Sequence, residues 1–395
     1  MPKLVEPALS ELWDGTQHSP RDLRKFRALS TGQQDHAMNT NFFCAKSLCT
    51  FINTITPQQC GCLFIFMNPK IIRWGIVGTG HAREFAKALA ALPEAQLVAV
   101  ASRFQDRADA FGQEFSVPHC YDSVAALAQN PEIDIVYVGS SPRNHAAHAL
   151  ECLSHGKSIL VEKPFTINAR EAQAVFDLAR ETNLFCMEAL WSRFLPATRE
   201  VAKWLAEGRI GTVRQVIADF GFCTEWDPQK RHFDIEQCGG CLLDVGVYSL
   251  AFATMATGEA PEKISAYATI SPTGVDEQTV LAAQYPGGAL GLLSCASRTQ
   301  TPHRGCIMGS EGRIEVEGFV WAHGATLFRN GQEPLLIEPK IPLPAYSYQA
   351  TESMRCLALD LRESPLLPST EIIARMKTMD EVRRQIGVVY PHSDG

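Results

Sequence analysis

Two charged residues stand at the end of an apolar run in the segment SILVEKPF (158–165). The run has the composition of a buried strand, and Glu162, Lys163 and a proline follow it directly. Burying a charge is costly unless the charge is paired or hydrogen-bonded. Two interpretations are therefore open: the chain leaves the core and both side chains are solvated, or they enter a site that uses their charges.

Asp244 and Tyr248 form a second candidate pair, in the segment LLDVGVYSLAFATMA (242–256). Residues four apart on a helix face the same way. The pair suits hydride transfer, in which an alcohol loses a proton as its carbon-bound hydrogen leaves as hydride. Tyrosine is a weak base with a pKa of about 10, but an ammonium such as that of Lys163 would lower this pKa. Asp244 would orient the lysine or the substrate hydroxyl. The alternative is a core tyrosine whose hydroxyl is capped by a neighbour.

A glycine-containing turn, Gly78-Thr79-Gly80, follows the apolar stretch RWGIV and precedes a helical pattern. Glycines at these positions permit a tight turn and let backbone amides reach a pyrophosphate at the helix N-terminus. The usual fingerprint has a third small residue three positions after the second glycine. Arg83 stands there, and Ala82 lies one place earlier. We therefore expect a dinucleotide site whose loop is one residue shorter than usual.

The end of the second apolar stretch discriminates between cofactors. An NAD site places an acid there, against the ribose 2′-hydroxyl. This chain has Ser102 and Arg103 instead. A hydroxyl and a guanidinium suit a 2′-phosphate, because arginine binds phosphate bidentately and with opposite charge. These residues favour NADP, and the alternative is an ordinary solvated arginine.

The elements that must hold these residues alternate between strand and helix from residue 73 onward. Short apolar runs rich in β-branched residues predict strands, and stretches with apolar residues three and four apart predict the helices between them. The predicted strands are RWGIVG, QLVAVAS, IDIVYVGS, SILVEKP and LFCMEAL. Continuous apolar strands are buried on both faces. The fold class is therefore α/β, beginning with a Rossmann domain on a doubly wound parallel sheet.

Beyond residue 211 the pattern changes to longer, alternating segments with hairpin signals such as Pro286-Gly287-Gly288. These predict an α+β domain with an open, mostly antiparallel sheet. Helical spacing returns from Tyr346 to Ile386. We place the NADP-binding Rossmann domain at 67–193 and the substrate-binding and dimerisation domain at 194–395.

Residues 1–66 differ from the rest of the chain. The first forty are polar without clear periodicity, and the apolar, cysteine-rich stretch 42–66 is interrupted by Lys46 and Pro57 before it reaches membrane-spanning length. We expect an extension without packed structure and a natural start at Met67. A membrane hairpin in this stretch is the weaker alternative.

Bulk composition limits the class of protein. With 395 residues and 46% hydrophobic content the chain can form two globular domains. A net charge of −7 favours neither nucleic acid nor an anionic membrane as partner, which leaves small molecules. Thirteen scattered cysteines and no signal peptide indicate a reduced, cytoplasmic protein. The one C-x-x-C, Cys238 to Cys241, lacks a second ligand pair, so we expect no metal.

Three motifs together resemble one family. Gly78-Thr79-Gly80, the E-K-P tripeptide at 162–164 and the D-x-x-x-Y of Asp244 and Tyr248 are similar to the glucose-fructose oxidoreductase/inositol dehydrogenase/MocA family. MEALWSRF (187–194) and GGCLLDVGVY (239–248) look like its branch of dimeric dihydrodiol dehydrogenases and NADP-dependent D-xylose 1-dehydrogenases. The resemblance extends from about residue 73 to residue 391.

The resemblance implies a role for each motif. Lys163 would hydrogen-bond the reacting oxygen beside the nicotinamide, Glu162 would hold local structure and charge, and the bond before Pro164 would be cis. His145 would lie near the nicotinamide ribose, and Trp191 would line the cofactor and substrate cleft. The implied cofactor contacts are Gly78, Thr79, Gly80, Ser102, Arg103, His145, Glu162, Lys163 and Trp191.

The resemblance also implies substrate contacts from Trp191, Arg214, Asp244 and Tyr248. Relatives that oxidise sugars often have histidine where this chain has Tyr248, which favours the dihydrodiol and xylose branch. The glycines at 239–240 match a small-residue run before the catalytic helix. The C-x-x-C spacing would then be a coincidence of this run and not a redox or metal motif. A homodimer formed through the open sheet of the second domain is likewise implied.

We therefore expect an NADP-dependent oxidoreductase without a metal, acting on a small polyol. The substrate would be a cyclic sugar such as D-xylose, oxidised at its anomeric carbon, or a trans-dihydrodiol. The alternative is a cofactor-binding regulatory protein on the same fold. Such a protein would be expected to lack the lysine or the acid–base residue, whereas this chain retains Lys163, Asp244 and Tyr248.

Overall fold

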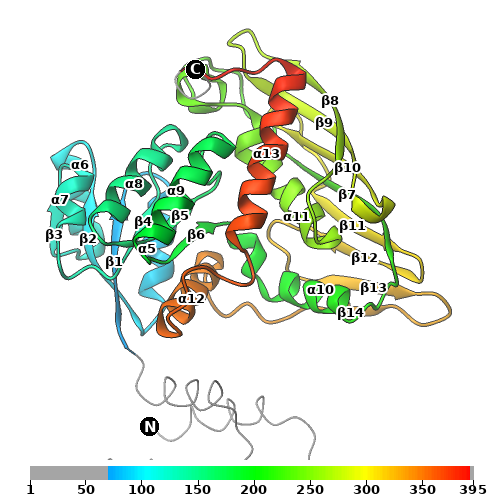
Figure 1. Ribbon diagram of the computed structural model, residues 1–395, viewed down its shortest axis with the longest axis horizontal. Helices are drawn as coiled ribbons and strands as arrows, with labels where there is room; N and C mark the ends of the chain where they lie inside the picture. Colours follow the sequence, from blue (N-terminus) through cyan, green and yellow to red (C-terminus); the bar gives the residue numbers. More distant parts are fainter. Residues whose placement is uncertain (1–69, 392–395) are drawn as a thin grey trace, which may run out of the picture. The chain divides into compact units, whose positions relative to one another are not determined.

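A computed structural model of the protein describes residues 70–391. The predicted extension 1–66, the membrane-hairpin alternative within it and the start at Met67 lie outside the described residues. The described chain forms two sheets with helices packed on them (Figure 1).

The first sheet has six parallel strands in the order β3-β2-β1-β4-β5-β6. This is the strand order of a Rossmann fold, and it confirms the predicted fold class. The strands are β1 (Ile72–Val77), β2 (Ala95–Ala101), β3 (His119–Tyr121), β4 (Ile135–Val138), β5 (Ser158–Glu162) and β6 (Cys186–Ala189). Every predicted strand of this sheet is present. The prediction missed β3, whose three residues are too few to show a pattern.

Helices connect the strands of the first sheet by crossovers. Those with eight or more residues have apolar residues buried against the sheet, as their three- and four-residue spacing predicts. The helices are α5 (Ala82–Ala90), α6 (Gln105–Phe115), α7 (Val124–Ala128), α8 (His145–Ser154) and α9 (Ala169–Glu181), with a short 3₁₀ turn η1 (Pro142–Asn144). Asn168 caps α9, because its side-chain oxygen accepts a hydrogen bond from the Glu171 amide at 2.9 Å.

The second sheet has eight strands in the order β14-β13-β12-β11-β7-β10-β9-β8. Only β7 and β10 pair in parallel, so the sheet is mostly antiparallel, as expected. The strands are β7 (Val213–Gly221), β8 (Lys263–Ile270), β9 (Asp276–Gln284), β10 (Leu290–Ala296), β11 (Arg304–Gly309), β12 (Gly312–Glu317), β13 (Ala325–Arg329) and β14 (Leu335–Ile337).

Most helices of the second region lie over one face of this sheet, whereas α12 (Ala345–Ala358) packs against α5 of the first region (Figure 1). They and the short turns are η2 (Trp191–Phe194), α10 (Pro196–Ala206), η3 (Arg231–Phe233), η4 (Ile235–Gln237), the π-helix η5 (Leu242–Gly246), α11 (Val247–Thr257), η6 (Pro286–Gly288), α12 (Ala345–Ala358) and α13 (Ser369–Ile386). Two of them also reach the first region. The Ser347 hydroxyl of α12 donates to the Ala88 carbonyl at 3.0 Å, and Asp380 of α13 accepts from the Ala169 amide at 2.9 Å.

The segment Ile235–Thr257 is the one stretch of the described chain that is long and apolar enough to cross a membrane. Its mean hydropathy is 1.4, but 89% of the window is buried inside the protein. A core helix has both properties. This segment packs under the second sheet and carries Asp244 and Tyr248.

Candidate active site

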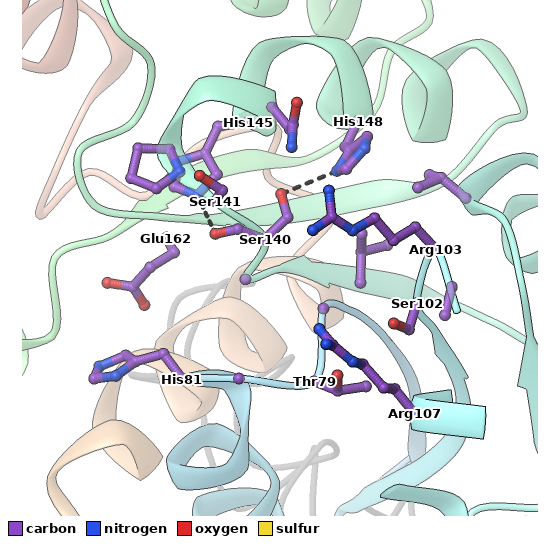
Figure 2. A pocket seen from close by; sticks show the side chains of 18 of the residues that line it. Thr79, His81, Ser102, Arg103, Arg107, Ser140, Ser141, His145, His148 and Glu162 are labelled. Atoms are coloured by element: carbon purple, nitrogen blue, oxygen red, sulfur yellow. Dashed lines mark hydrogen bonds between the residues drawn. The ribbon is translucent and has the colours of Figure 1, made fainter. Parts of the chain in front are cut away.

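A cavity of about 660 Å³ opens at the carboxyl ends of β1, β2, β4 and β5. Its volume lies within the range of about 300–1,000 Å³ that is usual for small-molecule and cofactor sites. Open parallel sheets place their ligands at this edge. Most of the lining comes from the loops that follow these strands, and Arg231, Gln237 and Asp244 enter from the second region. Figure 2 shows His81 and Glu162 towards one end of the cavity and Arg103 and Arg107 towards the other.

The two glycines of the turn after β1 serve different needs. Gly78 has a φ of +101°, and a Cβ there would lie 2.6 Å from the Gly139 carbonyl oxygen. Gly78 is therefore required for the turn itself. A Cβ on Gly80 would meet nothing within 4 Å, so this glycine borders open space at the start of α5. That space at the N-terminus of a helix fits a pyrophosphate.

The short form of the fingerprint has a physical basis. Helix α5 begins at Ala82, whose side chain is fully buried and lets the helix pack closely against the sheet. Arg83 points instead towards α6, where its guanidinium pairs with Glu114. Ala82 thus takes the role of the third small residue one position early.

Two arginines lie at the far end of the cavity. Arg103 and Arg107 are exposed, and their guanidinium carbons lie 5.0 Å and 4.8 Å from the centre of the Phe104 ring. Both line the cavity with Ser102, and neither forms an ion pair with another described residue. Asp122, after β3, lines the same end. Two unpaired guanidinium groups fit a phosphate better than an uncharged hydroxyl.

Glu162 and Lys163 do not leave the core for water, which settles the question raised by SILVEKPF. Glu162 is only 6% exposed, and the Tyr137 hydroxyl donates to its Oε2. Its Oε1 has no hydrogen-bond partner in the described structure. Burial, partly offset by the charge of Lys163, raises the pKa of Glu162 to about 7. The carboxyl group therefore changes charge near neutral pH beside the cavity.

His145 holds the turn that carries Lys163. It is fully buried, with Nδ1 2.8 Å from the Pro164 carbonyl oxygen and Nε2 3.1 Å from that of Ser140. Burial lowers the pKa of His145 to about 4, so the ring is neutral and donates to one of these carbonyls at a time. The Lys163–Pro164 bond is cis, as the resemblance implied. His145 lines the cavity as expected, but its ring nitrogens serve the protein backbone.

Lys163 reaches across to the second region. Its Nζ donates to the Asp244 carbonyl oxygen at 2.7 Å and to Asp244 Oδ1 at 3.2 Å. Arg231 Nη2 lies 3.1 Å from the same Oδ1, and His232 Nδ1 lies 3.0 Å from Oδ2. The charge of Lys163, with Arg231 and His232, outweighs the burial of Asp244 and holds its pKa well below the usual range. Asp244 is therefore an anion that contacts the lysine, and of its two expected roles this geometry fits the orientation of Lys163.

A glycine pair lets the loop carrying Arg231 approach Asp244. A Cβ on Gly239 would lie 2.5 Å from the Arg231 carbonyl oxygen, and one on Gly240 would lie 2.3 Å from Asp276 Oδ1. The Tyr390 hydroxyl donates to the Gly239 carbonyl at 2.6 Å, so a residue near the C-terminus supports this segment. The small-residue run expected before the catalytic helix is thus required by its neighbours.

The helix that carries Asp244 and Tyr248 differs from the expected one. Residues 242–246 form a π-helix, and the α-helix begins only at Val247. In a π turn residues four apart are not aligned as in an α-helix. Asp244 lines the cavity, whereas Tyr248 lies behind it, with Lys163 Nζ 5.2 Å from its ring centre. The two side chains flank Lys163 from different sides.

The predicted lowering of the Tyr248 pKa is wrong. Burial first, and then the charges of Glu162 and Asp244, raise this pKa well above its ordinary value. Lys163 lies over the face of the ring and does not contact the hydroxyl. Trp191 Nε1 donates a hydrogen bond of 2.9 Å to the Tyr248 hydroxyl oxygen. The hydroxyl hydrogen of Tyr248 can therefore be donated to another acceptor. Tyr248 is therefore a neutral phenol, suited to giving a proton to a substrate oxygen.

Aromatic side chains surround Tyr248. The Phe220 ring centre lies 5.6 Å from that of Tyr248, and Trp321 packs edge-on against Phe220 at 5.3 Å. Trp191 stacks on Tyr346 at 5.6 Å, and Tyr346 also shares a hydrogen bond of 2.9 Å with His81 at the glycine turn. Trp191, predicted to line the cleft, is not a lining residue of the large cavity but belongs to this aromatic wall.

The expected substrate contact from Arg214 is not supported. Arg214 is exposed near the start of β7, whereas Phe220, which packs on Tyr248, lies near its end. Six residues of an extended strand place the two positions roughly 20 Å apart. Arg214 is also absent from the cavity lining.

Several lining residues were missed by the sequence reasoning. Arg107 lies four positions after Arg103 at the start of a helix, and that spacing could have identified it. His148 lies on α8, and the others lie in short turns or loops with no readable pattern. The missed residues are His81, Arg107, Asp122, Ser140, His148 and Arg231.

The second cysteine of the C-x-x-C packs against other residues of the second region. The Cys241 thiol lies 3.0 Å from Asp276 Oδ2 and 3.6 Å from the sulfur of Cys295, all three side chains being buried. Asp276 Oδ2 also accepts from the Leu242 amide at 2.8 Å and from the Thr279 hydroxyl at 2.8 Å. These hydrogen bonds anchor the start of the π-helix below the site.

A Rossmann sheet with a glycine turn after its first strand, and a lysine at its carboxyl edge that lies over a tyrosine ring, is the arrangement expected of an oxidoreductase that uses a nicotinamide dinucleotide. Residues 72–190 match the model of the oxidoreductase family with an NAD-binding Rossmann fold, and residues 198–315 match the GFO/IDH/MocA C-terminal domain. The chain belongs to the GFO/IDH/MocA family of NAD(P)-dependent oxidoreductases.

Individual relatives confirm the resemblance to the dihydrodiol dehydrogenases. The chain is 37% identical to trans-1,2-dihydrobenzene-1,2-diol dehydrogenase of Mus musculus, over 81% of this chain and 98% of the relative. It is 35% identical to the Homo sapiens enzyme of that name over the same shares. Aldose-aldose oxidoreductase of Caulobacter crescentus, complexed with glycerol, has the same fold at 22% identity, with a TM-score of 0.73 over 80% of this chain and 97% of that chain. A 3-ketoreductase of Actinomadura kijaniata, in complex with NADP and TDP-benzene, is 25% identical, with a TM-score of 0.70 over 80% and 98%.

Proposed function

We propose that this protein is an NADP-dependent dehydrogenase that interconverts a secondary alcohol and a carbonyl on a small cyclic diol. The observation that carries the proposal is the convergence of Lys163 and Tyr248 beside the cavity, with Asp244 holding the lysine. The bound dinucleotide would supply the hydride donor or acceptor. The Gly78–Gly80 turn, Arg103 and Arg107 would hold it.

The residues of the chain would handle the reacting oxygen. In the carbonyl-reducing direction, neutral Tyr248 donates its proton to that oxygen, and the Lys163 ammonium stabilises the negative charge that develops on it. The alcohol-oxidising direction is the reverse and requires the phenolate of Tyr248. Because the pKa of Tyr248 is raised, the phenolate forms only at high pH, so oxidation should accelerate as pH increases.

We propose a trans-dihydrodiol as the substrate class, with cyclic sugars such as D-xylose as the second class. The support comes from the names of the relatives and from the aromatic wall beside Tyr248. Aromatic side chains favour a flat, apolar ring that carries two hydroxyl groups.

A substrate panel tests the proposed function. Trans-dihydrodiols, D-xylose and other cyclic sugars are assayed with NADP and with NAD, following reduced cofactor by absorbance. We expect the highest kcat/KM with NADP and a dihydrodiol. Highest kcat/KM with a sugar would assign the second class. Tight NADP binding without turnover of any compound would instead favour the cofactor-binding regulatory protein.

Cofactor choice should depend on the two arginines at the far end of the cavity. Replacing Arg103 with alanine should raise the KM for NADP by about 10-fold or more, because a charge-assisted contact to phosphate contributes roughly 1.5–3 kcal/mol. The KM for NAD, which lacks the 2′-phosphate, should change little. Arg107→Ala should act in the same direction, and the exposed Arg304→Ala serves as a control. An equal loss with both cofactors would place the arginines outside the 2′-phosphate site.

We propose a homodimer formed through the uncovered face of the second sheet, in a cytoplasmic protein. Exposed apolar side chains on that face support the dimer: Ile217, Tyr267, Ile270, Val280, Leu290 and Leu292. Their alternation with buried residues along β9 and β10 means that both faces of these strands carry apolar residues. Free thiols at all nine described cysteines support a reducing compartment. Analytical ultracentrifugation and fractionation of cells test the two proposals.

A further inference from the structure

A fully buried ion pair joins the last strand of the parallel sheet to the C-terminal helix. Glu188 on β6 and Arg375 on α13 have side chains that are 0% exposed, and Arg375 Nη2 contacts Glu188 Oε2. Replacing a buried ion pair with apolar residues of similar volume is often neutral or stabilising. Stability alone therefore does not account for two charges at this depth.

The second oxygen of Glu188 serves the turn that carries Lys163. Glu188 Oε1 accepts a hydrogen bond of 3.1 Å from the amide of Phe165, two residues after the lysine. The carbonyl of the intervening Pro164 faces His145 Nδ1 at 2.8 Å. The backbone that follows Lys163 is thus held from two sides, by a buried carboxylate and a buried imidazole.

The other end of the ion pair leads to the tyrosine. Arg375 Nη1 donates to Glu371 Oε1 at 3.3 Å, and Glu371 Oε2 accepts from Arg193 Nη2 at 2.9 Å. Arg193 belongs to η2 together with Trp191, whose indole donates to the Tyr248 hydroxyl. One helix, α13, therefore connects the turn of Lys163 with the turn that orients Tyr248.

We infer that Glu188, Arg375, Glu371 and Arg193 form a positioning relay that sets Lys163 against the Trp191–Tyr248 pair. The charges of the two carboxylates and two guanidinium groups sum to zero. None of the four side chains lines the large cavity. They act through other residues and are not catalytic groups. The inference rests on the proposed function, because positioning has meaning only if Lys163 and Tyr248 act on one oxygen.

The main test replaces the two charged side chains of the Glu188–Arg375 ion pair with apolar side chains of similar volume. The double variant Glu188→Leu, Arg375→Met should fold, as apolar replacements of buried pairs often do. The Phe165 amide then loses its acceptor, and η2 loses its link to the sheet. We expect kcat to fall by about 10- to 100-fold, since a misplacement of about 1 Å can cost roughly 10²-fold. The KM for NADP should stay within about twofold. A folded double variant with kcat within about twofold of wild type would overturn the relay.

A milder variant decides the question if the double variant does not fold. Glu371→Gln alters the middle of the relay at a side chain that is 12% exposed. It should lower kcat several-fold and leave the KM for NADP unchanged, whereas equal kcat would overturn the relay. The matched control is Asp134→Asn, whose carboxylate also accepts a backbone amide and an arginine, both from Arg73, away from the cavity. This control should lower the melting temperature without lowering kcat.

A second readout does not depend on activity. Crystals of the NADPH complexes would give the Lys163 Nζ to Asp244 and Trp191 Nε1 to Tyr248 hydroxyl distances, now 2.7 Å and 2.9 Å, in wild type and variants. Lengthened distances in the double variant or in Glu371→Gln would support the relay even if the wild type oxidised no tested alcohol, in which case only the proposed function fails. Unchanged distances in both variants would overturn the relay whatever the activity.

Discussion

Replacing Lys163 with methionine should lower kcat by about 10² to 10⁴, the range that general acid–base groups contribute. Methionine keeps an unbranched, apolar stem of similar length but removes the ammonium that would stabilise the reacting oxygen. Asp244 would retain Arg231 and His232 as partners, so its charge would not be left unpaired. Binding of NADPH, measured by fluorescence titration, should change little, because we propose that its contacts come mainly from the glycine turn and the arginines.

A second buried lysine provides the matched control for this variant. Lys157 is 7% exposed, and its Nζ donates to the carbonyls of Asn130 and Ile133 at 2.6 Å and 3.2 Å, outside the cavity. Lys157→Met should therefore lower the melting temperature but leave kcat of the folded protein near wild type. If Lys163→Met kept more than about a third of wild-type turnover, the lysine would have no part in the chemical step.

Replacing Tyr248 with phenylalanine should also lower kcat by about 10² to 10⁴, because it removes the proposed proton donor with little change in volume. The pH dependence separates this role from packing. Since the pKa of Tyr248 is raised, oxidation by the wild type should increase with pH through the alkaline range, and the variant should lose that increase. Steady-state rates in both directions, measured across pH, check the prediction.

Tyr285 is the control for the tyrosine. It is 1% exposed in the second sheet, and its hydroxyl has no hydrogen-bond partner among the described residues. Tyr285→Phe should leave both kcat and the pH profile unchanged. The double variant Lys163→Met, Tyr248→Phe should be little worse than the worse single variant, because both residues are proposed to act on one oxygen. Losses that multiply would indicate independent roles.

The parallel sheet was predictable because burial on both faces leaves a plain signal. Its strands read as continuous apolar runs, and the turn after β1 carries the glycines that a pyrophosphate site needs. The three residues of β3 gave no such run. Strands β11, β13 and β14 of the second sheet were also missed, and β14, with three residues, is likewise too short to show a pattern.

The sequence predicted those features of the site that follow from a local motif. It did not predict features that depend on contacts between residues far apart in the chain. Lys163 and Asp244 meet as expected. The Tyr248 pKa was predicted in the wrong direction because the sequence does not show that its hydroxyl is buried beside carboxylates and faces Trp191 rather than the lysine. The π-helix before it was also not predicted, and the Leu242 amide at its start is bound by Asp276, 34 residues away, a contact that local spacing does not show.

The support that Tyr390 and α13 give the cleft affects the order in which the protein can mature during synthesis. The ribosome releases the whole parallel sheet, Glu188 included, long before Arg375 and Tyr390 leave the exit tunnel. Until then the Glu188 carboxylate has no counter-charge, and the Gly239 carbonyl has no donor from Tyr390. A nascent chain can therefore complete its Rossmann sheet while its cleft is still unformed, and the cleft is completed only once α13 and Tyr390 have been synthesised and have packed.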